Sequence, residues 1–386
     1  MRTHAIASLA ALLALSACAP DFAGPEKVTA LRVLAVKAEP PEIGAGGDNA
    51  RSAADWPAAF TTLDALIGHP DFAADDRTDR AVVLHLACTP TPGSALGTIC
   101  TQTSALSEPS ALPLDLSTAC PATGAKHLGV VGGITIAGLQ SCNRSGCHSL
   151  AVRSDANDPG SLVDFGPSDY QLPTDAATDS FLGELPEGNR QRLLGTDAVV
   201  LSFAIEVGPE DSLSPAAPVP ATCGALLPRI VDWFGLHWPV RPHVASLKWI
   251  HVRGPEMPPQ FPPNANPQLS GIGVPAGDGT ADANPLPTSL AAGKQLDLLP
   301  VLPPPGFDGL RQDYQRFDTD GNLVDTRKEE WAYSWFTTRG DLDQSHTTSW
   351  DERNAFTPKA GAAMLWLVVR DLRGGEVWTA APVQAQ

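Results

Sequence analysis

The 386-residue sequence is poor in positive charge and in charged residues generally. It has 26 Lys plus Arg against 43 Asp plus Glu, a formal charge of -17, and only 18% of its residues are charged. Soluble domains average about 25% charged residues. Such an acidic balance argues against nucleic acid and against an anionic membrane surface as electrostatic partners.

The sequence also lacks the short motifs that identify common enzymes. It has no His-Glu-x-x-His zinc-protease motif, no Gly-x-Ser-x-Gly elbow, no P-loop and no dinucleotide-binding fingerprint. An enzyme here would depend on a spatial arrangement of side chains that the sequence does not display. We therefore predict no catalytic residue, and we expect a role other than catalysis.

Proline and glycine, in contrast, are abundant. The chain has 37 Pro and 34 Gly, and frequent proline interrupts the hydrogen bonds of long helices. With 43% hydrophobic residues the chain is too apolar to be disordered as a whole. These numbers favour a mainly β, loop-rich protein.

The N-terminus predicts export and lipid anchoring. An apolar run over residues 5–15 is too short for a transmembrane helix, which needs about 20 residues, and is typical of a secretory signal peptide. It ends in Leu-Ser-Ala-Cys, which resembles the bacterial lipobox, in which Cys18 would be acylated and become the first residue. Two or three acyl chains anchor a protein lastingly. Ala19, in place of Asp, favours the outer membrane. The alternative is an ordinary signal peptide with Cys18 in a disulfide.

Six further cysteines are candidates for up to three disulfides in an exported chain, with 15 possible pairings. Cys142 and Cys147, followed by His148, resemble an uncommon spacing for covalent haem attachment, and zinc is another alternative, but a local disulfide explains the pair better. The part of the chain after residue 223 has no cysteine and must depend on core burial. The six candidates are Cys88, Cys100, Cys120, Cys142, Cys147 and Cys223.

Apolar alternation predicts strands in both halves of the chain. In the first half they lie at 28–39, 80–88, 197–208 and 244–252, with short helices at 55–67 and 226–236. In the second half they lie at 294–302, 330–337, 362–370 and 376–383. Gly374-Gly375 predicts a hairpin turn between the last two strands. Trp331, Tyr333 and Trp335 should share one face of their strand, with Trp335 beneath the opposite sheet.

The predicted organisation has five parts. They are a signal peptide (1–17), a lipidated cysteine with a tether (18–27), an N-terminal β domain (28–252) with a Cys-containing insertion at about 89–195, a Pro-rich linker (253–267) that acts as a semi-rigid spacer, and a C-terminal β-sandwich (268–386).

Four segments carry a resemblance to a known family. After the lipobox they read LRVLAVKAEPPEIGAG, NPQLSGIGV, SWFTTRGDL and LWLVVRDLRGGEVWT. Together they resemble surface lipoproteins of myxobacterial type with immunoglobulin-like domains. The resemblance implies two immunoglobulin-like β-sandwich domains, the first with the long insertion and short helices, and a location at the cell envelope. It does not cover residues 89–195 and implies no activity.

One segment resembles a calcium-binding loop. Asp318, Asp320 and Asn322 supply oxygen ligands at positions 1, 3 and 5, and Glu329 supplies a carboxylate at position 12. The sixth position, which needs glycine, is Leu323. A plain hairpin turn built on Asp320 and the following glycine is the simpler interpretation. Calcium is therefore a weak cofactor candidate, and no other cofactor is predicted.

Three histidines, His237, His243 and His251, are close in sequence and could suggest a metal site or a catalytic base. Packed or surface histidines explain them better. The sequence as a whole predicts a lipid-anchored bacterial envelope protein that binds or scaffolds an unknown envelope protein or glycan. The alternative is an envelope hydrolase with immunoglobulin-like accessory modules, which would show converging carboxylates or a His–acid pair in a cleft around residues 89–240.

Overall fold

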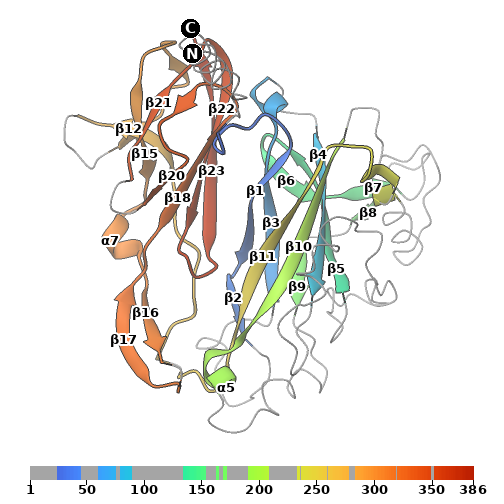
Figure 1. Ribbon diagram of the computed structural model, residues 1–386, viewed down its shortest axis with the longest axis vertical. Coiled ribbons are helices and arrows are strands. Elements are labelled where there is room, and N and C mark those ends of the chain that lie inside the picture. The colour runs from blue at the N-terminus through green and yellow to red at the C-terminus, as the bar shows by residue number, and fades with distance from the viewer. Residues whose placement is uncertain are drawn as a thin grey trace, which may run out of the picture.

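A computed structural model describes residues 24–44, 60–74, 79–88, 134–153, 162–164, 168–171, 190–207, 233–234, 236–258, 260–277, 283–318, 320–348 and 352–386. In these residues most elements are β-strands, so the prediction of a mainly β protein is confirmed. The two halves of the chain lie side by side (Figure 1). The predicted signal peptide, Cys18 included, lies outside the described residues.

The first half folds into two facing sheets, with strand orders β1-β3-β9 and β2-β11-β10-β4-β5-β6. Neighbouring strands are antiparallel, except that β2 runs parallel to β11. Side chains such as Ala38, Leu63 and Val200 fill the space between the sheets. The elements are β1 (Arg32–Glu39), β2 (Glu42–Gly44), β3 (Phe60–Gly68), η1 (Pro70–Ala73), β4 (Ala81–Cys88), β5 (Ile134–Asn143), β6 (Gly146–Ser149), β7 (Ala151–Arg153), β8 (Leu162–Asp164), β9 (Asp169–Gln171), α5 (Arg190–Leu194), β10 (Thr196–Glu206) and β11 (His243–Arg253).

The second half contains two five-stranded sheets, β13-β12-β15-β21-β19 and β14-β23-β22-β18-β20. Their shared core contains Trp331, Tyr333 and Trp335, which are nearly or fully buried together as the alternation predicts. The elements are β12 (Gly271–Pro275), β13 (Ala283–Pro285), β14 (Ser289–Leu290), β15 (Leu296–Val301), α7 (Phe307–Leu310), β16 (Asp313–Phe317), β17 (Leu323–Lys328), β18 (Ala332–Thr337), β19 (Asp341–Leu342), β20 (His346–Thr348), β21 (Asn354–Thr357), β22 (Gly361–Arg370) and β23 (Glu376–Ala385).

The predicted hairpin joins β22 to β23, which pair along their whole length. Its turn needs glycine twice. Gly374 has a φ of 106°, a left-handed conformation that side chains disfavour. A Cβ on Gly375 would lie 2.2 Å from Oδ2 of Asp371. That carboxylate accepts hydrogen bonds from the backbone N–H groups of Arg373 and Gly375 and so organises the turn.

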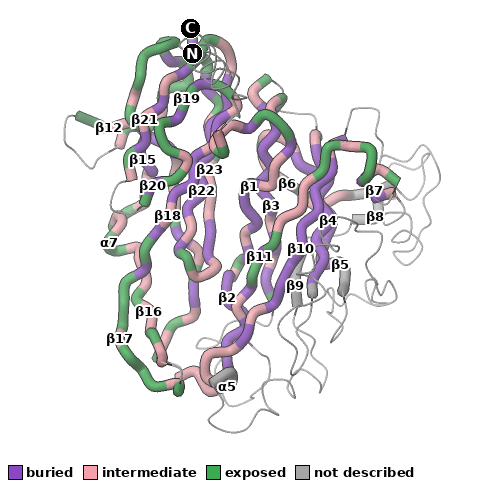
Figure 2. The backbone as a smooth tube through the Cα atoms, viewed as in Figure 1, coloured by how far each residue is buried: buried purple, intermediate pink, exposed green. Residues whose placement is uncertain are grey.

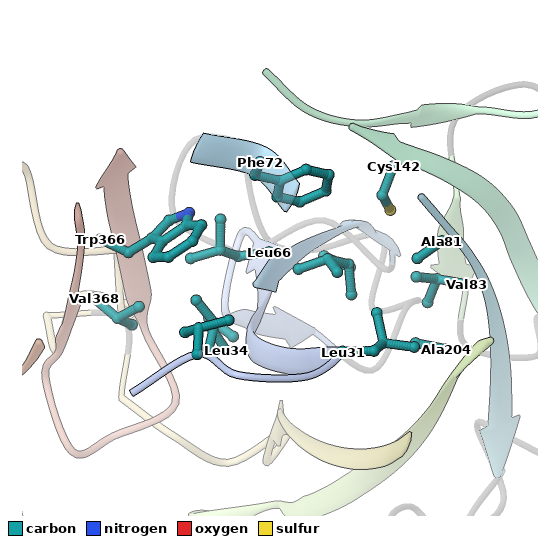
Figure 3. Close-up of a cluster of buried hydrophobic side chains, with 14 of the residues drawn as sticks. Leu31, Leu34, Leu66, Phe72, Ala81, Val83, Cys142, Ala204, Trp366 and Val368 are labelled. Carbon is teal, nitrogen blue, oxygen red and sulfur yellow. The ribbon is translucent and has the colours of Figure 1, made fainter. Parts of the chain in front are cut away.

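Strand β22 is buried on both faces, because its second face packs against the first half of the molecule. Ala363, Leu365, Leu367 and Val369 belong to the core of the second half. The alternate residues Met364, Trp366 and Val368 belong to a cluster with residues of β1, β3 and β4. Figure 3 shows Leu34 and Leu66 against Trp366 and Val368. In Figure 2 the strand is purple over most of its length. The two halves therefore share a hydrophobic core.

The predicted helix over residues 55–67 is wrong where it is described, because Phe60–Gly68 forms strand β3. Leu63 and Leu66 have helical spacing, but Leu63, Ala65 and Ile67 also alternate. Both faces of β3 are covered: Leu63 faces the six-stranded sheet, and Leu66 faces Trp366. A strand buried on both faces carries apolar residues at consecutive positions, and these can imitate a helical pattern.

Other predictions have mixed outcomes. The strands predicted at 80–88, 197–208 and 244–252 correspond to β4, β10 and β11. From the region predicted as an insertion, β5 and β6 extend the six-stranded sheet. The helix predicted at 226–236 lies mostly outside the described residues, although Trp233, Phe234 and Leu236 are helical.

The segment predicted as a linker, 253–267, contacts both halves. Asn264 donates its backbone N–H to Glu42, at 2.7 Å, and its side-chain amide to Asp371, at 2.8 Å. Asn266 donates to the carbonyl oxygen of Ala38 and accepts from the backbone N–H of Glu376. These hydrogen bonds tie β1 and β2 to the β22–β23 hairpin.

Candidate functional site

A cleft of about 470 Å³ lies between β11 of the first half and the β22–β23 hairpin of the second. This volume is within the range of small-ligand sites, about 300–1,000 Å³. We call it the central cleft and define it by Leu247, Lys248, Trp249, Leu372, Gly374 and Glu376, with Asp197 and His251 at one end.

The apolar part of the central cleft comes from side chains that a folded protein would ordinarily bury. Trp249 is 43% exposed, Leu247 is 36% exposed and Leu372 is 67% exposed. Leu247 and Trp249 share one face of β11 because side chains two positions apart in a strand point the same way. Leu372 protrudes from the hairpin turn with a φ of 61°. A side chain of this size in the left-handed region is uncommon.

The polar part of the cleft is built around the buried carboxylate of Glu376. The ammonium of Lys248 donates to Glu376 at 2.5 Å and to the carbonyl oxygen of Gly374 at 2.6 Å. Arg370 approaches the other oxygen of Glu376 at 3.3 Å and also donates to the carbonyl oxygen of Leu34. Lys248 and Glu376 are both almost fully buried. Two cations thus share one carboxylate, and the contacts join β1, β11, β22 and β23.

His251 and Asp197 form a pair at the end of the cleft. Nδ1 of His251 lies 3.0 Å from Oδ1 of Asp197, and the two residues face each other across β10 and β11. Burial works to lower the pKa of His251, but hydrogen bonds to Asp197 and to the backbone of Leu194, with the charges of Glu42 and Asp197, outweigh it and raise this pKa. The two hydrogen bonds also fix the orientation of the imidazole at this end of the cleft.

A smaller hollow of about 270 Å³ adjoins the central cleft through His251 and Arg373. It contains the buried ion pair of Glu42 and Arg253, at 2.8 Å. Arg373 binds Glu329 at 2.8 Å and lies over the ring of Tyr314. Burial raises the pKa of the Glu329 carboxyl, and the neighbouring charge of Asp371 raises it further. Hydrogen bonds to this carboxyl and the charge of Arg373 lower its pKa, but by less.

The residues of the predicted calcium loop occupy two different places. Asp318 holds the β16–β17 turn, since Oδ1 accepts from the backbone N–H groups of Asp320 and Asn322 at 2.9 and 2.8 Å. The side-chain amide of Asn322 donates to the other oxygen of Asp318, and this hydrogen bond, together with the backbone ones, lowers the pKa of Asp318. Glu329 follows Lys328, which pairs with Asp313 at the far end of the ribbon. At about 3.3 Å per residue, a six-residue strand separates Glu329 from the turn by about 20 Å.

Of the candidate disulfides, the structure shows the one between Cys142 and Cys147, which joins β5 to β6 next to their turn. The local disulfide interpretation of this pair is confirmed. Cys88 ends β4. Cys18, Cys100, Cys120 and Cys223 lie outside the described residues.

Removing this disulfide should cost about 2 kcal/mol of unfolding free energy. The bond closes a loop of sequence separation 5, and the chain-entropy estimate for so short a loop is about 2 kcal/mol. We expect the Cys142→Ala, Cys147→Ala variant to show this loss in urea unfolding under non-reducing conditions. Ser145→Ala, in the same turn, is the control and should unfold like the unmodified protein. An unchanged midpoint for the double variant would contradict the prediction.

A buried polar group in the first half has the residue types of a hydrolase site but not its accessibility. His85 contacts the hydroxyl of Ser202 through Nδ1 at 2.8 Å and the amide oxygen of Gln140 through Nε2 at 3.1 Å. His85 and Ser202 are 0% exposed. Burial lowers the pKa of His85 to about 4, so it is a neutral, structural histidine at neutral pH.

Comparison of the sequence with protein-family models and with curated proteins finds no significant match. In the part of the chain that the structure describes, no helix is long and apolar enough to span a membrane. Nor do three or more His, Cys, Asp or Glu side chains gather there as a metal site.

Sequence reasoning named His251 as one of three neighbouring histidines and Gly374 as a turn residue, but it did not single out the other residues of the central cleft. A signal was present in the strand VASLKWIHV, where Leu247 and Trp249 alternate with Lys248 and Ile250. Apolar side chains thus occur on both faces of a strand with one lysine among the inward positions. This pattern indicates that the outward apolar residues pack against another part of the protein or a ligand, or that the lysine forms an ion pair. Leu372 and Glu376 could not be linked to β11 by any local pattern.

Proposed function

We propose that this protein is a lipid-anchored protein of the bacterial cell envelope, attached through Cys18 and made of two immunoglobulin-like sandwich units, with a binding role. The observation that carries the proposal is the short apolar run that ends in Leu-Ser-Ala-Cys. The Cys142–Cys147 disulfide supports it, because such bonds persist mainly in oxidising compartments outside the cytosol.

Two further features support the architecture and the role in this proposal. The second half has paired antiparallel sheets around a buried Trp335, an arrangement that suits an immunoglobulin-like core. The central cleft combines exposed apolar side chains with fixed polar groups, which is typical of a binding site. The acidic surface of the chain then serves solubility at the envelope.

The anchor is tested by replacing Cys18 with serine. The serine hydroxyl is not a substrate for thioether lipidation, so the Cys18→Ser variant should leave the membrane fraction and appear in the soluble periplasmic fraction. Ala19→Ser, at the neighbouring position, should stay with the membranes. Metabolic labelling with a fatty acid should mark the unmodified protein and Ala19→Ser only. A Cys18→Ser protein that remains in washed membranes would overturn the proposal.

A further inference from the structure

The basic side chains around the central cleft are already paired with carboxylates, which restricts what can bind there. Lys248 and Arg370 share Glu376, His251 holds Asp197, and Arg373 holds Glu329. An anionic ligand would have to compete with these carboxylates for their cations. It would also approach a chain with a formal charge of -17, which repels anions at long range.

The cleft also offers an exposed aromatic surface beside a carboxylate that can accept hydrogen bonds. The indole of Trp249 is 43% exposed. Asp197 is half-exposed and binds His251 through one carboxylate oxygen, so its second oxygen can accept. The ammonium of Lys248 lies on the opposite, buried face of β11, where Gly374 and Glu376 bind it.

We propose that the central cleft binds a neutral oligosaccharide. A sugar ring has one face of C–H groups, which packs on an indole, and a rim of hydroxyls that donate and accept. The apolar face fits Trp249 with Leu247 and Leu372, and the hydroxyls fit the second oxygen of Asp197, whose partner His251 lies on the same face of β11 as Trp249. From Leu247 to His251 the strand extends about 13 Å, which accommodates a short oligosaccharide rather than a single ring.

This inference deepens the binding role proposed above and rests on it. The test uses purified full-length protein, titrated calorimetrically with three neutral tetrasaccharides: cellotetraose, maltotetraose and tetra-N-acetylchitotetraose. We expect at least one of them to bind and to shift the indole N–H resonance of Trp249, assigned from its absence in the Trp249→Ala spectrum. For that sugar, Trp249→Ala should weaken affinity at least about tenfold, or about 1.4 kcal/mol.

Two further variants separate stacking from folding. Trp249→Phe keeps an aromatic face and should retain most of the affinity. Leu323→Ala removes a similarly exposed apolar side chain from β17, which does not line the cleft, and should bind like the unmodified protein. Tetragalacturonate, which carries carboxylates, should bind more weakly than the neutral sugars.

Three results would overturn the inference: no neutral tetrasaccharide binds, Trp249→Ala binds as the unmodified protein does, or tetragalacturonate binds most tightly. Membrane fractionation of Cys18→Ser tests the lipid anchor independently of saccharide binding. A protein that fails the titration but is released by that substitution would keep the proposed envelope location and lose the saccharide.

Discussion

Trp366→Ala should lower the free energy of unfolding by about 3–5 kcal/mol, the range for removing a buried tryptophan. Trp366 is 1% exposed and packs with Leu34, Leu66 and Phe72 of the first half. The substitution leaves a large cavity between the halves, in a place where two sheets meet and cannot collapse easily. Urea unfolding followed by circular dichroism measures the loss.

Double-mutant cycles show whether this loss belongs to the interface between the halves. Trp366 and Leu66 share a cluster, so Trp366→Ala and Leu66→Ala should be non-additive, whereas residues without shared partners usually add. Phe356→Ala is the control, because Phe356 belongs to the core of the second half. Additivity of the Leu66 pair, or coupling of Trp366 to Phe356 instead, would contradict a shared core between the halves.

The second large effect is a loss of stability in mild acid that originates at His85. In the folded protein the pKa of His85 is lowered to about 4, whereas an unfolded histidine titrates near 6.5. Between these pH values the unfolded state binds more protons than the folded state. The contribution of His85 to the free energy of unfolding is therefore fully present above pH 6.5 and is lost as the pH falls toward 4. The difference corresponds to about 3 kcal/mol.

Comparison with a variant isolates this contribution from other groups. His85→Gln keeps an amide that can bond Ser202 and Gln140 but does not titrate. Between pH 7 and pH 4 the free energy of unfolding should fall in both proteins. The fall should be smaller in His85→Gln, and the difference between the two falls should be about 3 kcal/mol. His346→Ala removes an exposed histidine from β20 and should keep the original pH dependence. Equal pH dependence of His85→Gln and the unmodified protein would contradict the prediction.

The strand β22 shows how much of the fold could be predicted. Its sequence AAMLWLVVR identifies a strand, and Gly374-Gly375 correctly predicts the hairpin that follows. The run is apolar at every position from Ala362 to Val369, which is typical of a strand covered on both faces. That second signal predicts an additional partner sheet, but not which one. The partner, β1 and β3, comes from the other end of the chain.

The candidate site could be predicted much less well. The sequence identified β11 as a strand. Trp249, however, forms a cleft only together with Leu372 and Glu376, which follow it by more than 100 residues. The His251–Asp197 pair depends on the register between β10 and β11. Register decides which side chains meet across a sheet, and neither composition nor motif reports it for strands joined by a long segment.

The sequence by itself determined the properties that depend on near neighbours along the chain: the strand periodicity, the hairpin turn, the shared face of Trp331 and Trp335, and the closeness of Cys142 and Cys147. The tertiary structure decided what depends on distant segments. It buried Glu42 against Arg253, covered both faces of β22 and placed Trp249 at a cleft. The reason is physical: dihedral preferences and side-chain alternation act over a few residues, whereas burial and ion pairing depend on which surfaces pack together.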